Sequence, residues 1–203
     1  MVSLIYSYKL KWLGDDIFIV FRYVQNFVAG NGLVYNVGEK VEGYTDFLWT
    51  MILCLFAKIK FSPLNVSQLL GIISSLSTLV VMALAGNKIA KQRKQFLLPF
   101  ITISLAINYD YNVWATSGLE TSFYTFLMCM AFYTFFFAEM KEAKRLVLTG
   151  LYLSLAIMSR PDGLLVVAVA NALLVMNYLL NKTTTFITSF INYLGTLRAL
   201  IHL

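Results

Sequence analysis

Long uncharged apolar stretches, separated by short polar segments, dominate the chain. The three clearest are long enough for helices that cross a bilayer, which takes about 17–25 residues: Phe61–Asn87, Thr121–Ala138 and Gly163–Asn181. Shorter or less apolar candidates are Gln95–Tyr109, Leu146–Ser159 and Phe186–Leu203. They can still cross where their ends snorkel or line a polar cavity. With no internal repeat and no linker, the pattern predicts an all-α polytopic transmembrane bundle, with residues 1–203 as one membrane domain.

The apolar run Phe47–Ala57 covers only about half a bilayer and is more typical of an interfacial or re-entrant segment. We therefore expect Asp46–Lys60 to be a helix at the outer surface, with Trp49 at headgroup level. If this run crossed instead, the sidedness of residues 14–45 would be reversed. The N-terminal stretch Met1–Leu13 is too short to span and lacks the cleavage site of a signal peptide. The expected fold is thus a bundle with an outer-face loop that carries short interfacial helices.

Composition supports a protein that lies in the lipid bilayer. Of the residues 59% are hydrophobic and 13% are charged, whereas soluble domains carry about 25% charged residues. This excludes a cytosolic enzyme, a disordered regulator and a secreted disulfide scaffold. His202 is the single histidine, which excludes a His-rich zinc site. Cys54 and Cys129 lie in apolar runs and are interpreted as small buried hydrophobes. The net charge of +6 comes with no basic stripe interleaved with aromatic residues, so no nucleic-acid partner is expected.

The basic residues predict the orientation of the spans. Lys and Arg cluster at 88–94 and at 141–145, and such clusters are typical of cytoplasmic loops. Alternation of the spans then places loops 14–60, 110–120 and 160–162 on the outer face of the plasma (inner) membrane. Eight of the ten acidic residues share that face. Because the acidic residues did not enter the assignment, their distribution supports it.

Asp15 and Asp16 are adjacent carboxylates at the start of the first outer loop, and three interpretations are open. Repulsion between them raises the proton affinity of each, so one could act as a general base near neutral pH. Together with water molecules, the pair could hold a divalent cation. Alternatively, they are acids at a helix N-terminus, stabilised by the helix dipole.

Two further polar segments belong to the same predicted face. Glu120 opens a span after Trp114-Ala-Thr-Ser-Gly-Leu, either as an N-cap or first-turn acid or as part of a site. Arg160 follows a short span and precedes Pro161, which breaks the helix. Its guanidinium could bind a phosphate with bidentate geometry. It could equally pair with Asp162 or contact a lipid headgroup.

The three segments together resemble GT-C type bacterial glycosyltransferases, similar to the mycobacterial terminal arabinofuranosyltransferases. The resemblance rests on Asp15-Asp-Ile-Phe-Ile-x-Phe-Arg22-Tyr-x-x-Asn26, on the segment Gly30–Trp49, on Trp114–Thr121 and on Arg160-Pro-Asp-Gly163, in the expected order. It covers roughly residues 14–180. The family often has Glu at the position of Asp162.

This resemblance implies a multi-pass enzyme that takes a sugar from a polyprenyl-phosphate donor. The sugar would pass to a cell-envelope glycan, lipid or protein acceptor outside the membrane. By the same resemblance, Asp15 or Asp16 would deprotonate the acceptor hydroxyl and Glu120 would orient the acceptor or the base. Arg160, with Arg22, would neutralise the departing phosphate. The other implied substrate-binding or loop-forming residues are Asn26, Glu42, Tyr44 and Asp162.

The chain departs from the family at both ends. Met1–Leu13 stands where the family has a full first transmembrane helix, and family members continue well beyond Leu203. We therefore expect an N-terminal fragment of a longer GT-C membrane domain. The alternative is a catalytically inactive truncated or accessory multi-pass membrane protein. A small transporter is less favoured, because transporters place ionisable groups inside their spans and here nearly all acids lie in loops.

Overall fold

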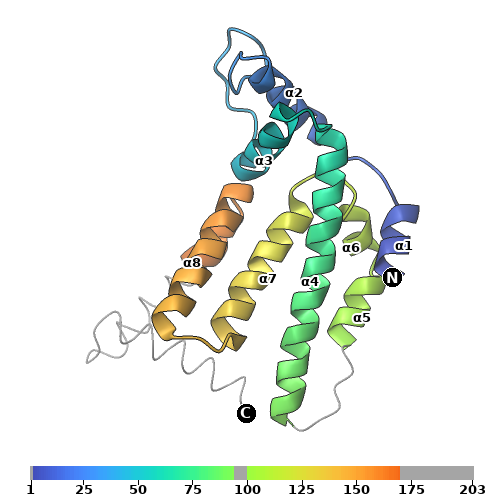
Figure 1. Ribbon diagram of the computed structural model, residues 1–203, viewed down its shortest axis with the longest axis vertical. Coiled ribbons are helices and arrows are strands. Elements are labelled where there is room, and N and C mark those ends of the chain that lie inside the picture. The colour runs from blue at the N-terminus through green and yellow to red at the C-terminus, as the bar shows by residue number, and fades with distance from the viewer. Residues whose placement is uncertain (1, 94–99, 170–203) are drawn as a thin grey trace.

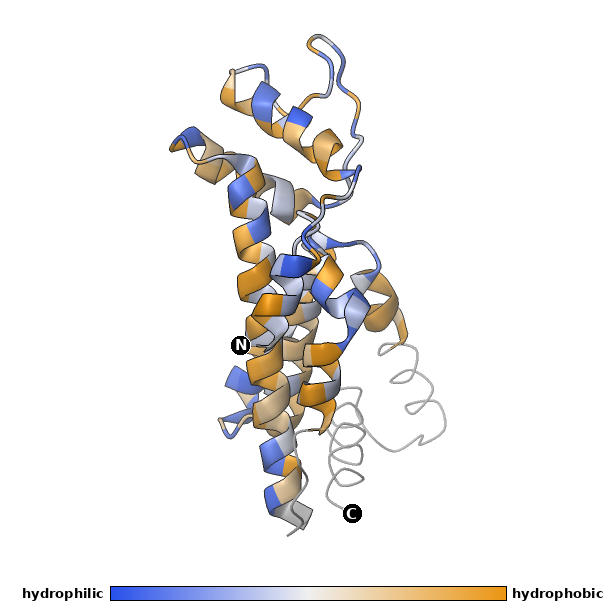
Figure 2. Cartoon of the chain, turned by 90° about the vertical axis from the view of Figure 1, so that its right-hand side faces the viewer, coloured by the Kyte–Doolittle hydropathy of each residue, from blue (hydrophilic) through white to orange (hydrophobic). Residues whose placement is uncertain are grey.

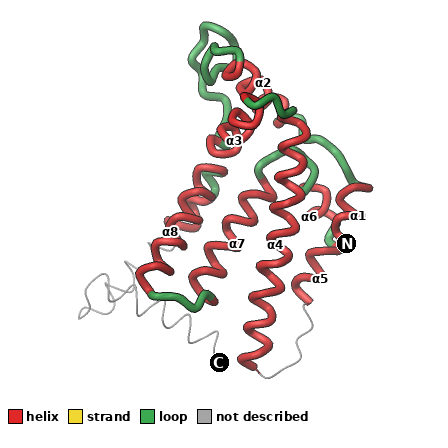
Figure 3. Tube along the Cα trace, viewed as in Figure 1, coloured by secondary structure: helices red, strands yellow, loops and turns green. Residues whose placement is uncertain are grey.

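The computed structural model describes residues 2–93 and 100–169, which form helices joined by loops, with no strand among them (Figure 3). The helices are α1 Val2–Lys9, α2 Ile17–Val28, α3 Phe47–Lys58, α4 Pro63–Arg93, α5 Phe100–Ile107, α6 Tyr109–Trp114, α7 Thr121–Phe137 and α8 Glu142–Ser159. A further helical segment begins at Gly163 and is described as far as residue 169. The prediction of an all-α fold is confirmed for this part of the chain.

The longer helices lie side by side in the order α8, α7, α4, with α5 beyond α4 (Figure 1). Helix α4 runs the length of the structure, from the end where α2 and α3 pack together. At the opposite end, Lys88 Nζ lies 2.8 Å from Glu139 Oε1 and donates to the Phe137 carbonyl at 2.7 Å. These contacts link the last turns of α4 to the connection between α7 and α8. The three polar segments of interest lie at the α2–α3 end, away from this basic end.

The described hydrophobic core joins α2, α3 and the start of α4. Its buried members come from one face of each helix: Ile17, Val20, Val24, Trp49, Leu53, Cys54 and Val66. Full burial of side chains of this kind contributes about 1.5–3 kcal/mol each. Cys54 is fully buried, as expected from its apolar surroundings. The core therefore anchors the two short helices that carry the first polar segment.

Among the described residues, one helix is long and apolar enough to cross a bilayer, namely α4 over Pro63–Lys91. Only 28% of its most apolar window is buried, which is unlike a core helix of a soluble protein. Large apolar side chains such as Leu69, Ile73 and Val80 are about half exposed along it. Figure 2 shows hydrophobic positions along the middle of the long helices and hydrophilic positions frequent in the loops beyond them. Such exposed apolar faces are what lipid would cover.

The predicted spans agree with the helices of the structure to different degrees. From Pro63 on, Phe61–Asn87 coincides with α4, and Thr121–Ala138 corresponds to α7, whose 17 residues are at the lower limit for a span. Within Gln95–Tyr109, α5 ends at Ile107, and the side chain of Asn108 accepts a hydrogen bond from the Tyr111 backbone N–H to cap α6. The expected outer loop 110–120 therefore begins as a helix. Phe186–Leu203 and most of Gly163–Asn181 lie outside the described residues.

The interfacial helix expected over Asp46–Lys60 is present as α3. Its end is set by Lys60, whose φ of 66° is left-handed, and by a hydrogen bond from the Phe61 N–H to the Phe56 carbonyl at 3.1 Å. The position of α3 relative to a membrane stays a prediction, as does the treatment of residues 1–203 as one domain.

Candidate functional site

A tight turn after Trp114 presents Glu120 at the start of α7. The Ser117 hydroxyl donates to the Trp114 carbonyl at 3.0 Å and accepts from the Leu119 N–H at 3.2 Å. Gly118 has a φ of +83°, which side-chain-bearing residues rarely adopt, and an added Cβ would lie 3.2 Å from Ile17 Cγ1. The Gly14 N–H donates to the Ser117 carbonyl at 3.0 Å. The turn is thereby joined to the segment just before Asp15.

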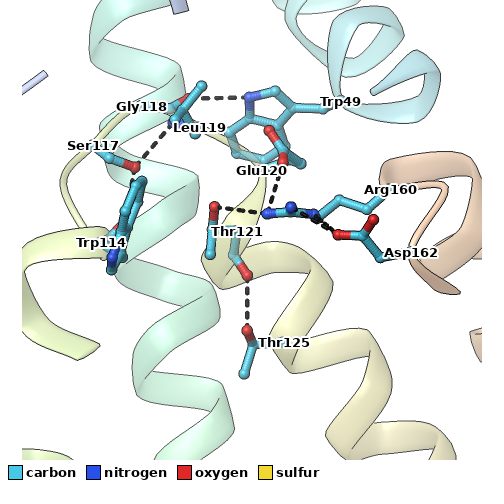
Figure 4. A network of polar contacts seen from close by, with 10 residues as sticks. All are labelled: Trp49, Trp114, Ser117, Gly118, Leu119, Glu120, Thr121, Thr125, Arg160 and Asp162. Carbon is cyan, nitrogen blue, oxygen red and sulfur yellow. Dashed lines mark hydrogen bonds and ion pairs between the residues drawn. The ribbon is translucent and has the colours of Figure 1, made fainter. Parts of the chain in front are cut away.

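Trp49 connects this turn to α3. Its side chain is fully buried, and the indole N–H donates to the Gly118 carbonyl at 3.0 Å (Figure 4). The ring also packs against Phe123 of α7, with centroids 5.6 Å apart. The N-terminus of α3, where Asp46 lies, is therefore held beside the N-terminus of α7, where Glu120 lies.

Glu120 caps α7 by position, but its carboxylate makes no capping hydrogen bond. Instead its Oε1 lies 3.5 Å from Arg160 Nη1 (Figure 4). Arg160 also binds Asp162 Oδ2 through Nη2 at 2.8 Å and Nε at 3.1 Å. Arg160 has extended backbone angles, as the residue before Pro161 should. The predicted Arg160–Asp162 pair is thus present, and Glu120 forms a second ion pair with the same guanidinium.

The environment of Glu120 opposes its ionisation. The Glu120 side chain is only 12% exposed, and burial raises the pKa of its carboxyl group above the usual value. Arg160 lowers that pKa, whereas the charges of Asp162 and Asp16 raise it. The net direction is upward. A carboxyl group with a raised pKa beside a cation in a cavity is typical of a functional site, although ion-pair networks produce the same shift.

A cavity of about 590 Å³ lies between these segments, within the usual size range of ligand pockets. Its wall residues come from α2, the segment before α3, the 114–121 turn and the residue after α8: Asp16, Ile19, Val20, Gly43, Tyr44, Thr45, Asp46, Trp114, Leu119, Glu120, Thr121 and Arg160. All three polar segments singled out in the sequence therefore meet at one place.

The two adjacent aspartates differ in their relation to the cavity. Asp16 belongs to its wall, whereas Asp15 does not. Asp16 stands at the N-cap position of α2 and makes no side-chain capping hydrogen bond. Of the three open interpretations, the position at a helix N-terminus agrees with the structure, and the roles of a general base and of a cation site stay predictions.

The expected substrate-binding residues divide into two groups. Tyr44 and Arg160 line the cavity, whereas Arg22, Asn26, Glu42 and Asp162 do not. The buried Asn26 donates from Nδ2 to the carbonyls of Val34 and Tyr35, both at 2.8 Å. Arg22 Nε donates to the same Tyr35 carbonyl at 3.2 Å. Asn26 and Arg22 thus hold the glycine-rich loop after α2, and substrate contacts by either residue stay a prediction.

Asp15 and Asp16 are both exposed. Among the described residues, no three or more His, Cys, Asp or Glu side chains are placed to hold a metal ion together. Two carboxylates leave most positions around a divalent cation to water or to substrate oxygens. The divalent cation at this pair stays a prediction.

Asp46 is the residue of the site that the sequence interpretation did not single out. It lines the cavity, yet it is only 6% exposed. Burial and the nearby charge of Glu120 raise the pKa of this carboxyl to about 7. In the sequence, Asp46 reads simply as the acid that starts an apolar helix. Nothing in that pattern shows the burial of its side chain or its closeness to Glu120.

Two curated proteins match the chain, and both are named terminal beta-(1->2)-arabinofuranosyltransferase. The protein from Corynebacterium glutamicum is 34% identical over 111 residues, which covers 54% of this chain and 16% of that protein. The protein from Mycobacterium tuberculosis is 33% identical over 125 residues, which covers 57% of this chain and 19% of that protein. The chain therefore spans less than a fifth of the length of these relatives.

No family model and no solved structure matches the chain. Both matches nevertheless have an identity of about one third over somewhat more than half of the chain, and they point to the same group of proteins as the motifs do. The resemblance inferred from those motifs is confirmed: this chain is similar in sequence to a small part of the terminal arabinofuranosyltransferases.

Proposed function

We propose that the chain is a membrane glycosyltransferase, or part of one, that transfers a sugar from a polyprenyl-phosphate donor. The acceptor is a cell-envelope glycan, lipid or protein on the outer face of the plasma membrane. One observation carries the proposal: Asp16, Glu120 and Arg160, from three separate motifs, line a single cavity. The names of the two relatives favour a pentofuranose such as arabinofuranose as the sugar.

The residue types suit glycosyl transfer. Asp16 would take the proton of the acceptor hydroxyl while the acceptor oxygen bonds to the anomeric carbon. The bond from that carbon to the donor phosphate breaks, and the electron pair leaves with the polyprenyl phosphate. We assign the base to Asp16 rather than Asp15 because only Asp16 belongs to the cavity wall.

Glu120 and Arg160 complete the proposed site. Glu120 would orient the acceptor or the base, because the ion pair with Arg160 holds its carboxylate in place. Arg160 would stabilise the negative charge that develops on the leaving phosphate. It would do so while sharing its guanidinium with Asp162, which binds two of its nitrogens.

Several features support a membrane setting for this chemistry. Helix α4 can span a bilayer by length and composition, and large apolar side chains are exposed along it. The cavity lies near the α2–α3 end, whereas the Lys88–Glu139 contact marks the opposite, basic end. By the positive-inside rule, the cavity would then lie on the outer face. A donor anchored by its own lipid would reach the cavity from the interface.

The test is a transfer assay with the full chain in proteoliposomes. Polyprenyl-phosphoryl arabinofuranose is the donor, and a synthetic arabinofuranoside is the acceptor. We expect transfer by the wild type, a loss of about 10²–10⁴-fold in D16N, as for a removed general base, and a rate in D15N within a few-fold of wild type. If the folded wild type shows no transfer, the inactive or accessory interpretation takes its place. If D15N rather than D16N loses activity, the assignment of the base is wrong.

A further inference from the structure

Asp46 has one carboxyl oxygen that nothing in the described structure satisfies. The Thr50 hydroxyl donates to Oδ1 at 3.2 Å, whereas Oδ2 is buried without a hydrogen-bond partner. The side chain forms part of the cavity wall although the residue is 94% buried. Buried polar atoms are almost always paired, so an orphaned oxygen beside a cavity calls for a ligand that completes it.

A structural role accounts for only one of the two oxygens of the Asp46 carboxyl group. Asp46 stands at the N-cap position of α3, but its side chain makes no capping hydrogen bond to the backbone of the helix. Its contact within the helix is the one from Thr50 to Oδ1. The terminal torsion of an aspartate is broad, so either oxygen can turn towards the cavity. The orphaned oxygen is therefore not explained by helix capping.

The charges around the cavity limit what can enter it. Three of its wall residues are acids, Asp16, Asp46 and Glu120, and its one basic wall residue is Arg160. That guanidinium is already paired with both Glu120 and Asp162. In the proposed function Arg160 also faces the donor phosphate, so a carboxylate on the sugar itself would meet the acids of the wall with no further cation there to offset it. A neutral polyhydroxyl ligand would not meet this repulsion.

We infer that Asp46 is a sugar-binding residue whose carboxyl group hydrogen-bonds a hydroxyl of an uncharged sugar, and that this cavity selects neutral over acidic sugars. The inference rests on the proposed function and narrows its substrate class. The burial that leaves Oδ2 without a partner also keeps Asp46 partly protonated near neutral pH. A carboxyl group in that state can both donate to and accept from a hydroxyl, which suits a sugar rather than a cation.

The experiment measures binding directly and does not depend on transfer. The full chain in detergent is titrated with methyl α-D-arabinofuranoside and with the acidic methyl β-D-glucuronide. Binding is followed by tryptophan fluorescence, since Trp114 lies in the cavity wall. We expect the wild type to bind the neutral glycoside at least tenfold more tightly. We expect D46A to weaken that binding at least tenfold and D46N about threefold. D110N, an exposed carboxylate outside the cavity wall, should leave binding unchanged.

The outcomes separate the inference from the proposed function. If folded D46A, or D46N should D46A fail to fold, binds the neutral glycoside as tightly as wild type does, the inference is overturned while transfer activity can stand. If wild type binds neither glycoside, or prefers the glucuronide, the inference is overturned as well. If binding depends on Asp46 but the transfer assay is negative, the sugar site stands and the proposed function fails.

Discussion

Glu120 Oε1 lies 3.5 Å from Arg160 Nη1, although the two residues belong to different motifs at the ends of different helices. The contact joins the first turn of α7 to the residue that follows α8. Asp162 binds the same guanidinium from its exposed side, so Arg160 is shared between two carboxylates. This sharing keeps a largely buried acid and a cation together in the wall of the cavity.

Removal of Arg160 should change how the site responds to pH. Arg160 lowers the pKa of Glu120 against the effect of burial, so R160A should raise that pKa further. If ionised Glu120 is needed for transfer, the acidic limb of the pH–rate profile will move to higher pH. The profile of K40A, which removes an exposed cation outside the cavity wall, should keep its wild-type limb. A slower R160A with an unmoved limb would argue against the pairing.

The raised pKa of Asp46 predicts a pH-dependent stability. Its pKa is about 7 in the folded chain and 3.8 as the ordinary value, so the folded state holds the proton more tightly than the unfolded state. The stabilising effect is complete below about pH 4 and is lost as pH rises towards 7. Above pH 7 the charged carboxyl then costs on the order of 4 kcal/mol. D46N should remove this dependence.

Thermal unfolding in detergent at pH 5 and pH 8 tests that prediction. The fall in melting temperature between the two values should be smaller in D46N than in wild type. D110N, which alters an exposed acid, should fall as much as wild type does. Equal falls in all three proteins would show that Asp46 is not protonated in the fold.

The indole of Trp49 should matter more than a chemically similar indole at the surface. W49F removes the hydrogen bond to the Gly118 carbonyl in a fully buried site, which should cost about 1–3 kcal/mol. W12F is the matched control, because Trp12 donates in the same way to the Val113 carbonyl at 2.9 Å but is 38% exposed. Chemical denaturation of both variants should show the larger loss for W49F. The reverse order would contradict the proposed link between α3 and the turn.

Gly118 and Gly32 offer a test of packing at constant backbone strain. Their φ values are +83° and +82°, so alanine carries a similar strain at both, of about 1–2 kcal/mol. An added Cβ at Gly118 would also meet Ile17, Leu13 and Ser67 at 3.2–3.3 Å, whereas nothing lies within 4 Å at Gly32. G118A should therefore be the less stable of the two in the same unfolding assay. Equal losses would mean that the turn yields to the added methyl group.

The orientation is testable with single cysteines in a background without Cys54 and Cys129. Val37 is 65% exposed in the loop after α2, and Ala143 is exposed in the first turn of α8. A membrane-impermeant thiol reagent applied to intact cells should label V37C and leave A143C unlabelled until the cells are opened. Labelling of A143C alone would reverse the assigned sidedness.

Local patterns in the sequence were sufficient for much of the helical framework. The uncharged run around α4, the break at Pro161 and the apolar run of α3 each depend on neighbouring residues. Hydrophobic length and helix-breaking residues act over a few turns at most, so their effects are visible in the sequence itself. The motif residues Asp16, Glu120 and Arg160 could likewise be recognised in the sequence. Their chemistry follows from the residue type and does not depend on the tertiary structure.

Which of these side chains share a cavity depended on packing between distant segments. Asp15 and Asp16 are adjacent and identical in the sequence. The backbone turns from one residue to the next, so only Asp16 belongs to the cavity wall. Asp46 reads as a helix start, and its burial follows from the contacts of Trp49 with Gly118 and Phe123. Burial and a second carboxylate nearby shift the pKa of Asp46 through space. Neither effect can be read from the spacing of residues along the chain.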